Sequence, residues 1–295
     1  MAVTGDTQLT ATKQELISEI AQRALFEQSR LLGTIRDVSQ FAVKGAESIS
    51  FPNYSTLFTV ENRASAVAGT TQDSVFGKDQ MALDVRAHIQ WLIDSNDEIE
   101  STLDVQAEYI RQAAAAHAGA PVNSVDANII AEMETAGITT TTAGAVSQDV
   151  VLEMRQILLQ NKANPSELYM AVSPAQEAEL LKIDPFISAD KYGSAIIPQG
   201  VLGSLYGVKV VVSSLLGADQ YFMYERMGCA IGFQRQPQFD EVRSPEYGPG
   251  AMLQVLAQKY GVEALQKGVP GAFQADGSTP ILATESAFIV KDNNP

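Results

Sequence analysis

Residues 94–118, DSNDEIESTLDVQAEYIRQAAAAHA, constrain the fold more than any other stretch, because they match the pattern of one long helix. Ser95 and Glu98 form a capping box, in which each side chain satisfies a backbone N–H at a helix start. Gly119 and Pro121 end the pattern, since glycine suits a C-terminal cap and proline cannot continue the hydrogen-bond ladder. The sequence therefore predicts a straight helix of ~35 to 40 Å, long for a globular protein.

One side of this predicted helix is suited to packing. Its residues recur at alternating steps of four and three, so a narrow seam faces one partner surface over about six turns. We expect Ile110, near the middle of the seam, to be buried against the sheet of its own subunit. The seam consists of Ile99, Leu103, Gln106, Ile110, Ala113 and His117.

The clearest strand pattern directly precedes this helix. Residues 81–91 alternate between apolar and polar side chains, which is typical of a strand with one buried face and one face in water. Such a strand needs an antiparallel partner, and residues 55–61 are the simplest choice. The apolar set is Met81, Leu83, Val85, Ala87, Ile89 and Trp91, and the polar set includes Arg86 and His88.

The polar residues 62–80 form a long connection, and loops of that length are usually functional excursions. We therefore expect residues 49–92 to form a long two-stranded projection. An isolated pair of strands is marginally stable in water, so this one should pack on a neighbouring subunit, and residues 62–80 should be mobile in a free subunit.

At the N-terminus, residues 1–13 carry no periodicity and are expected to be a mobile tail. Residues 13–32 predict a helix with a capping box at Thr12 and Glu15 and an end at Gly33. We expect this helix to be an arm laid against another surface rather than part of a domain core. Its apolar stripe is Ile17, Ile20, Ala21, Ala24 and Leu31.

The second half of the chain predicts an α/β lobe. Residues 122–135 are a short amphipathic segment, and residues 147–161 have a helical pattern with Val150, Val151, Met154, Ile157 and Leu158 as its apolar side. Leu168–Val172 is a predicted strand, Ser173 a helix cap, and residues 174–182 a helix that starts with proline. After a turn-rich loop at 193–207, further strands are expected at 208–213, 221–224, 228–235 and 286–290, with a bend at Pro237, Pro245 and Pro249.

Composition sets outer limits on function. The 295 residues, 45% of them hydrophobic, are enough for about two domains of a soluble globular protein. The net charge of −15 argues against a nucleic-acid-binding surface, because phosphate contacts need clustered lysine and arginine. No apolar run approaches the ~20 residues of a membrane span, and the N-terminus lacks the features of a signal peptide, so cytosolic synthesis is expected.

The sequence offers no catalytic, cofactor-binding or metal-ligating residue. Cys229 is the one cysteine, which excludes an intramolecular disulfide and a cysteine-rich zinc site, and we interpret it as a small buried apolar residue. We interpret His88, on a wet strand face, and His117, at a helix C-terminus, as structural. The common nucleotide-binding, nucleophile and metalloprotease motifs are absent.

Two acidic groups have structural interpretations. The acidic residues of 94–100 suit the positive end of a helix dipole better than a calcium loop, since the loop glycine and terminal glutamate are missing. Asp240 and Glu241 are interpreted as a solvated face or as partners in an ion pair between subunits.

In order, the chain shows an arm, a long hairpin, a spine helix, an α/β lobe and a return to extended structure. Over nearly its whole length it resembles the major capsid proteins of tailed bacteriophages, whose fold is named for phage Hong Kong 97. The most specific parts of the resemblance are the stretches LDVRAHIQWLIDSNDE, GVLGSLYGVKVVVSS and YERMGCAIGFQRQPQFDEV.

This resemblance implies an α+β fold with five parts. They are an N-terminal arm at 1–46, an extended β-hairpin loop at 47–92, a peripheral domain with the spine helix at 93–145, an axial domain at 146–222, and a return to the peripheral domain with C-terminal strands at 223–295.

The implied function is structural and not enzymatic, with no cofactor. Hexamers and pentamers of the chain would assemble into the icosahedral procapsid of a tailed phage, which matures by expansion and encloses double-stranded DNA without sequence-specific binding. Assembly in the host bacterial cytoplasm would use a scaffolding protein and a portal, with a decoration protein as an optional partner and no membrane. Residues 1–46 are too few for a fused scaffolding domain, so a separate scaffolding protein or a cleaved precursor is expected.

One member of that family joins its subunits covalently through a loop lysine, a neighbour's asparagine and a catalytic glutamate. Lys78 lies in the corresponding region, but neither other residue has a match here, so we interpret Lys78 as an ordinary surface lysine. We therefore expect the subunits to be held by non-covalent contacts.

Two other functions remain open. An encapsulin-like bacterial nanocompartment would share the fold but hold an enzyme cargo instead of a genome. A cytosolic enzyme with an unrecognised site in the α/β lobe would show a concave pocket with convergent polar groups.

Overall fold

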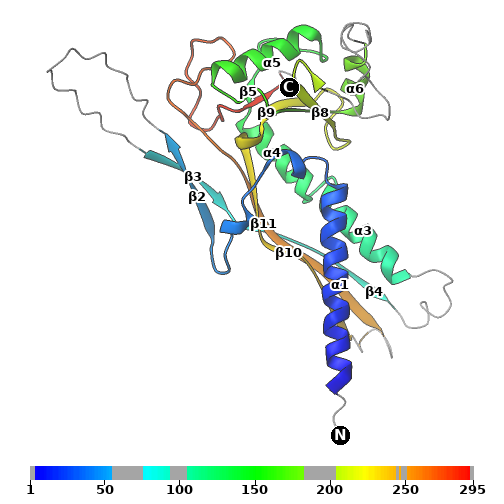
Figure 1. The fold of residues 1–295 in the computed structure, drawn as a ribbon. Helices are drawn as coiled ribbons and strands as arrows, with labels where there is room; N and C mark the ends of the chain where they lie inside the picture. The colour runs from blue at the N-terminus through cyan, green and yellow to red at the C-terminus, as the bar shows by residue number, and fades with distance from the viewer. Residues whose placement is uncertain are drawn as a thin grey trace, which may run out of the picture.

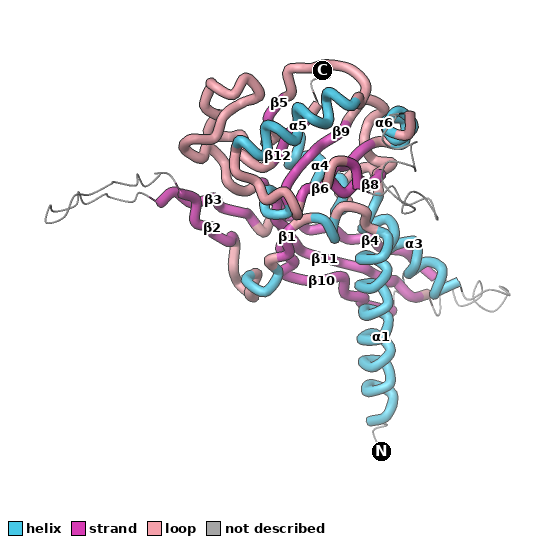
Figure 2. The backbone as a smooth tube through the Cα atoms, turned by 45° about the horizontal axis from the view of Figure 1, so that its top comes forward, coloured by secondary structure: helices cyan, strands magenta, loops and turns pink. Residues whose placement is uncertain are grey.

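The structure is a computed structural model, and it describes residues 4–54, 76–93, 105–182, 204–243, 246 and 251–292. The strands of this described part form three sheets of four, six and two strands. Figures 1 and 2 show a body of two lobes, one around each of the larger sheets, with the two-stranded sheet projecting from one side.

The four-stranded sheet is built mainly from distant parts of the chain. Its outer strand at one side pairs in parallel, and the other pairings are antiparallel. The strand order is β1 (Arg36–Asp37), β10 (Cys229–Arg243), β11 (Met252–Ala264) and β4 (Val85–Ile93).

Helices cover one side of this sheet, where α4 (Val125–Ala136) packs toward the other lobe. α3 (Val105–Gly119) packs on the sheet, and α1 (Thr4–Gln28) lies beside α3 and along β10 (Figure 1). Ile110 is 4% exposed, as predicted, and contacts both the sheet and α1. The buried cluster between these elements contains Ile17, Ala21, Ile110, Ala113, Ala114, Phe239 and Leu256.

The predicted alternation of residues 81–91 is confirmed, but its pairing is wrong. Met81 and Leu83 are buried while Arg86 and His88 are exposed. The segment forms two strands, β3 (Phe76–Ala82) and β4, and β4 pairs with β11 rather than with residues 55–61. Residues 55–61 lie outside the described residues, and alternation within one strand carries no information on which distant strand completes the sheet.

The six-stranded sheet confirms the predicted α/β lobe. α5 (Gln148–Gln160), capped by Ser147, covers one face with all five predicted apolar residues buried. α4 (Val125–Ala136), capped by Ser124, packs with the opposite face, and α6 (Pro174–Leu180) follows the predicted Ser173 cap. The strand order is β5 (Ile138–Thr139), β12 (Ile289–Lys291), β9 (Tyr221–Glu225), β6 (Leu168–Val172), β8 (Val208–Val212) and β7 (Ser204–Leu205).

The N-terminal helix differs from its prediction at both ends. It begins at Thr4, so most of the expected tail is helical and the capping box at Thr12 is wrong, because extending an established helix costs little. It ends at Gln28 rather than at Gly33, since Asp126 of α4 accepts hydrogen bonds from the backbone N–H groups of Arg30 and Leu31. The side chain of Ser29 also donates to Asp126.

The packing of α1 also corrects the interpretation as an arm. Ile20, placed on the buried stripe, is 53% exposed, whereas Leu25 is fully buried in the core shared with α4 and the sheets. Helix α1 is therefore part of the core of its own subunit.

Strand β10 continues past the predicted bend. Pro237 lies within the strand at an irregular point, where the pairing register with β11 shifts between Phe233 and Arg235 and again between Arg235 and Gln238. Proline cannot donate to a ladder, and a bulge accommodates it. Pro245 and Pro249 lie outside the described residues.

Several predicted features cannot be compared with the structure. The capping box at Ser95 and Glu98, the seam residues Ile99 and Leu103, and most of the loop at 193–207 fall outside the described residues. The predicted end of the helix at Gly119 is confirmed.

The two-stranded sheet crosses the four-stranded sheet at a pair of glycines. β2 (Ser48–Tyr54) and β3 are antiparallel, and Gly232 and Gly261 lie opposite each other in β10 and β11. A Cβ atom on Gly261 would overlap the carbonyl oxygen of Ala82, and one on Gly232 would lie 2.8 Å from the Met81 Cε atom. The hairpin therefore meets the sheet backbone to backbone.

Candidate functional site

The most distinctive surface feature is the hairpin of β2 and β3, which leaves the body in both views (Figures 1 and 2). Within the described residues, its root packs on the body. Ile49, Phe51 and Met81 are buried there in a small cluster with residues of the preceding loop and of β10. The predicted projection at 49–92 is thus found for β2 and β3, whereas residues 85–92 belong to β4 of the body sheet, and packing of the hairpin on a neighbour stays a prediction.

Polar contacts fix the root of the hairpin to the segment after β11. The Asp79 carboxylate accepts a hydrogen bond from the Gln266 backbone N–H at 2.7 Å. The Asn53 side-chain amide donates to the Lys267 carbonyl oxygen at 2.6 Å and to Asp79 at 3.3 Å. Sequence reasoning missed the contacts with Gln266 and Lys267, because their partners in the hairpin lie 187 and 214 positions away.

Lys78 lies on this hairpin, exposed and opposite Pro52 of β2. Among the described residues, no hydrogen bond or ion pair engages its ammonium group. This position fits the interpretation of Lys78 as a surface lysine, while its chemistry in an assembly stays a prediction.

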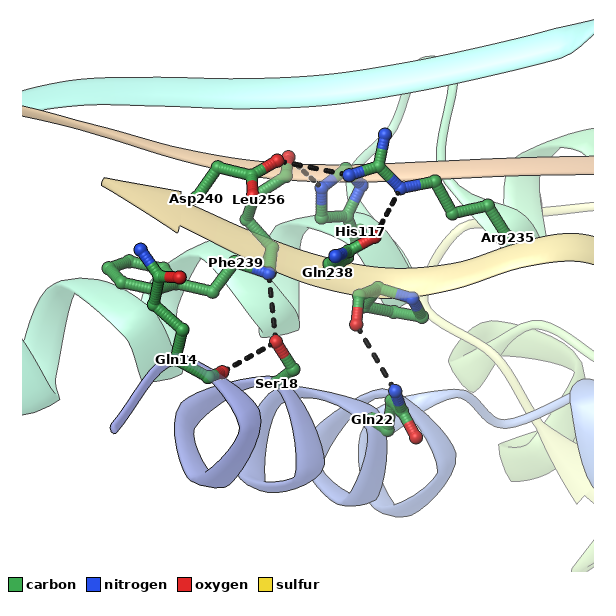
Figure 3. A network of polar contacts seen from close by, with 10 residues as sticks. Gln14, Ser18, Gln22, His117, Arg235, Gln238, Phe239, Asp240 and Leu256 are labelled. Carbon is green, nitrogen blue, oxygen red and sulfur yellow. Dashed lines mark hydrogen bonds and ion pairs between the residues drawn. The ribbon is translucent and has the colours of Figure 1, made fainter. Parts of the chain in front are cut away.

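Helix α1 covers an open edge of β10 (Figure 3). β1 pairs with β10 only at Ala230 and Ile231, so the rest of that edge needs other partners. The Ser18 hydroxyl accepts from the Phe239 backbone N–H at 3.0 Å, and the Gln22 amide donates to the Pro237 carbonyl oxygen at 3.3 Å. These contacts prevent β10 from pairing with another strand along this stretch.

The cysteine and the two histidines occupy the environments expected for them. Cys229 is fully buried, and burial raises the pKa of its thiol, which keeps it protonated. His117 is 3% exposed, its Nε2 lies 3.1 Å from the Leu256 carbonyl oxygen, and burial lowers its pKa despite that contact. His88 is exposed on the wet face of β4.

The acidic pair in β10 agrees with the first of its two interpretations, a solvated face. The Asp240 side chain is 50% exposed and lies 3.0 Å from the Arg235 guanidinium of its own chain (Figure 3), whereas an ion pair between subunits stays a prediction. Elsewhere in the described part, no three His, Cys, Asp or Glu side chains gather in a way that could hold a metal ion. None of the helices described is both long and apolar enough to cross a membrane.

Comparison with known proteins decides the family. A family model described as "Phage capsid protein" matches residues 26–247, which is most of the chain. The chain belongs to this phage capsid protein family. A comparison with curated protein sequences finds no match.

Solved structures show the fold of this capsid protein. A Mycobacterium phage Che8 chain aligns with a TM-score of 0.66 and 18% identity over 90% of this chain and 91% of its own. The mature capsid of bacteriophage PhiM1 aligns with a TM-score of 0.61 and 14% identity over 90% and 88%. A virus-like particle from Pyrococcus furiosus aligns with a TM-score of 0.58 and 10% identity over 95% and 99%. The capsid protein has the α+β Hong Kong 97-like fold that the sequence predicted.

Proposed function

We propose that this capsid protein is the major capsid protein of a tailed bacteriophage, and that it assembles as hexamers and pentamers into an icosahedral shell around double-stranded DNA. The family match over residues 26–247 carries the proposal. The two-stranded hairpin, whose described buried residues lie at its root, supports it, because such a projection gains stability from a neighbouring subunit.

The proposed shell function is structural, without a catalytic or cofactor-binding residue. The net charge of −15 suits a container, since an inner wall that bound phosphate tightly would impede packing and release of DNA. A scaffolding protein, a portal and an optional decoration protein are the proposed partners. Assembly would take place in the host bacterial cytoplasm, and expansion of the procapsid would follow.

The proposed parts of the subunit are an N-terminal part at 1–46 whose helix α1 packs in the subunit's own core, an extended loop at 47–92, a peripheral domain at 93–145, an axial domain at 146–222 and a return at 223–295. The six-stranded lobe supports the axial assignment. Within the proposed loop, β4 belongs to the body sheet, and the two-stranded sheet consists of β2 and β3.

A bacterial nanocompartment is the second candidate. The virus-like particle from Pyrococcus furiosus aligns over almost its full length with this chain, so the same subunit shape can close a shell that is not called a phage head. The two functions differ in contents, which are a genome in one case and a protein cargo in the other.

Electron cryomicroscopy of particles purified from expressing or infected bacteria tests the proposal. Closed icosahedral shells with nuclease-protected DNA are expected from infected cells. Co-purifying enzyme inside DNA-free shells would favour the nanocompartment. A chain that stays monomeric alone and with its scaffolding protein would contradict both functions.

The same particles test cohesion without covalent links. Boiling in detergent without reductant should release monomers at the chain mass of 31.7 kDa. A ladder of oligomers that survives reductant would instead identify Lys78 as a crosslinking residue.

A further inference from the structure

The face of the four-stranded sheet opposite α3 carries a groove of about 780 Å³, here called the basic groove. Its titratable lining residues are Lys44, Arg86, His88, Arg235 and Lys259. No aspartate or glutamate is among the described residues that line it, although the chain has 35 acidic and 20 basic residues. The groove is therefore positively charged, although the chain as a whole carries a net negative charge.

Strand register places three of these cations in one row. Lys259 of β11 pairs with Arg235 of β10 on one side and with Arg86 of β4 on the other. Residues directly opposite in neighbouring strands project from the same face, and like charges there destabilise the sheet. The row is thus unfavourable in a free subunit and would be stabilised by an anionic partner.

The subunit neutralises this row only in part. Arg235 contacts Asp240 and the Gln238 side-chain oxygen, and Lys259 donates to the Gln234 side-chain oxygen at 2.5 Å. Within the described residues, the Arg86 guanidinium has no hydrogen-bond or ion-pair partner.

The margin of the groove is held in place by its own contacts. The Gln234 side-chain amide donates to the carbonyl oxygens of Val43 at 2.9 Å and of Ala46 at 2.7 Å. These bonds fix the turn that carries Lys44 beside the cation row. The positive charges are therefore arranged by the fold rather than scattered on mobile loops.

We propose that the basic groove binds the acidic segment 94–104 of a second copy of this chain. Charge complementarity selects that segment, which contains Asp94, Asp97, Glu98, Glu100 and Asp104 and no lysine, arginine or histidine. Residues 55–75 hold two acids and one arginine, and residues 183–203 hold two acids and one lysine, so both are nearly neutral.

The geometry favours a neighbour's segment over the chain's own. β4 carries the chain away from Arg86, and its end at Ile93 lies seven residues, or about 23 Å, further along the strand. That a second copy of the chain lies next to the groove rests on the proposed shell function. Within that function, the inference identifies one contact that orients adjacent subunits.

Zero-length crosslinking tests the contact directly. Unlabelled and nitrogen-15-labelled subunits are mixed before assembly and treated with a carbodiimide, which joins an amine to a carboxylate already in contact. Mass spectrometry should find Lys44 or Lys259 joined to a carboxylate of residues 94–104 in pairs that combine the two isotopes. Same-isotope pairs alone would place the segment on its own groove, and links only to other carboxylates would exclude the segment. Either result overturns the proposal.

A charge variant provides a second, independent measurement. Arg86→Gln with Lys259→Gln should raise the subunit concentration needed for assembly by about three- to tenfold, as expected for two partly exposed ion pairs. The free subunit should melt about 1 °C or more higher, because the like-charge row is relieved. A purely structural role for the row would lower the melting temperature instead. Lys182→Gln with Arg226→Gln is the control, since it removes the same charge from exposed positions on the other lobe.

The outcomes separate this inference from the proposed function. Failure of the unsubstituted chain to form shells contradicts the shell function, and mixed-isotope crosslinks in small oligomers would still support the groove contact. Normal assembly of the groove variant overturns the groove contact alone. Normal assembly with less retained nucleic acid would assign the groove to phosphate and overturn it as well.

Discussion

The two large sheets of this capsid protein differ in how many of their faces are covered. In the six-stranded sheet, β9 is buried along its whole length, with Tyr221 and Met223 in the core with α5 and Phe222 and Tyr224 in the core with α4. In the four-stranded sheet, β4 alternates between partly covered and exposed residues, and the helices α1, α3 and α4 pack on the side of its partly covered residues.

This difference separates two tasks within one subunit. A sheet covered on both faces is stabilised by its own core and has no surface left for a partner. A sheet with one open face keeps that face available, and here the open face holds the basic groove and the root of the hairpin. We therefore infer that the four-stranded lobe is the part that responds to neighbours, and the following substitutions test that contrast.

The largest effect is expected at the helix that covers the four-stranded sheet. Ile110→Asp would place a carboxylate in a site that is 4% exposed, without a partner, and should lower the free energy of unfolding by about 5 kcal/mol. Chemical denaturation and soluble yield measure it. Tyr109→Asp on the same helix is the control, because Tyr109 is 41% exposed. Equal free energies of unfolding for the two variants would contradict the assignment of Ile110 to the buried seam of the helix.

A smaller loss is expected in the covered sheet. Met170→Ala removes a fully buried side chain from β6 and should cost about 2–4 kcal/mol through lost burial and an internal cavity. The measurement is urea unfolding of the free subunit. A loss below about 1 kcal/mol would mean that this core can collapse around the cavity, and that it is looser than the structure indicates.

The buried His117 extends the comparison to pH. Burial lowers the pKa of His117, so the unfolded chain binds its proton more readily, and stability should fall as pH drops through the ordinary value of 6.5. His117→Gln should reduce this fall. Melting temperatures between pH 7 and pH 5 provide the measurement, and identical profiles for His117→Gln and the unsubstituted chain would contradict the prediction.

The smallest effect is expected on the open face. Leu92 is 40% exposed at the end of β4, so Leu92→Ser should change the free energy of unfolding of the free subunit by no more than about 0.5 kcal/mol. A loss comparable to that of Met170→Ala would show that the face is covered in the isolated subunit. Urea unfolding of the free subunit, as for Met170→Ala, measures the change.

Local patterns predicted the six-stranded lobe well. The helix at 147–161 and the strand, cap and proline at 168–174 are signals read from adjacent residues, and tertiary packing agrees with them. The ends of α1 were missed because one is set by helix extension and the other by Asp126, almost a hundred positions away.

The four-stranded sheet could be predicted only in part from the sequence. β4 was identified by its alternation, but its true partner β11 lies more than 150 residues away. The basic groove was missed for the same reason. Lys44, Arg86, Arg235 and Lys259 come from four separate segments, and only the register of three strands brings them together.

The glycine crossing determines how force would pass through the subunit. Backbone lies on backbone where β3 meets β11, and Asp79 and Asn53 tie the hairpin to the segment after β11. No side chain at Gly261 separates the two layers, so the root of the hairpin and the sheet should move together. A force on the outer ends of β2 and β3 would then twist β11, which leads toward the segment joining the two lobes. Any change in the spacing of adjacent subunits would accordingly be felt as torsion inside each one.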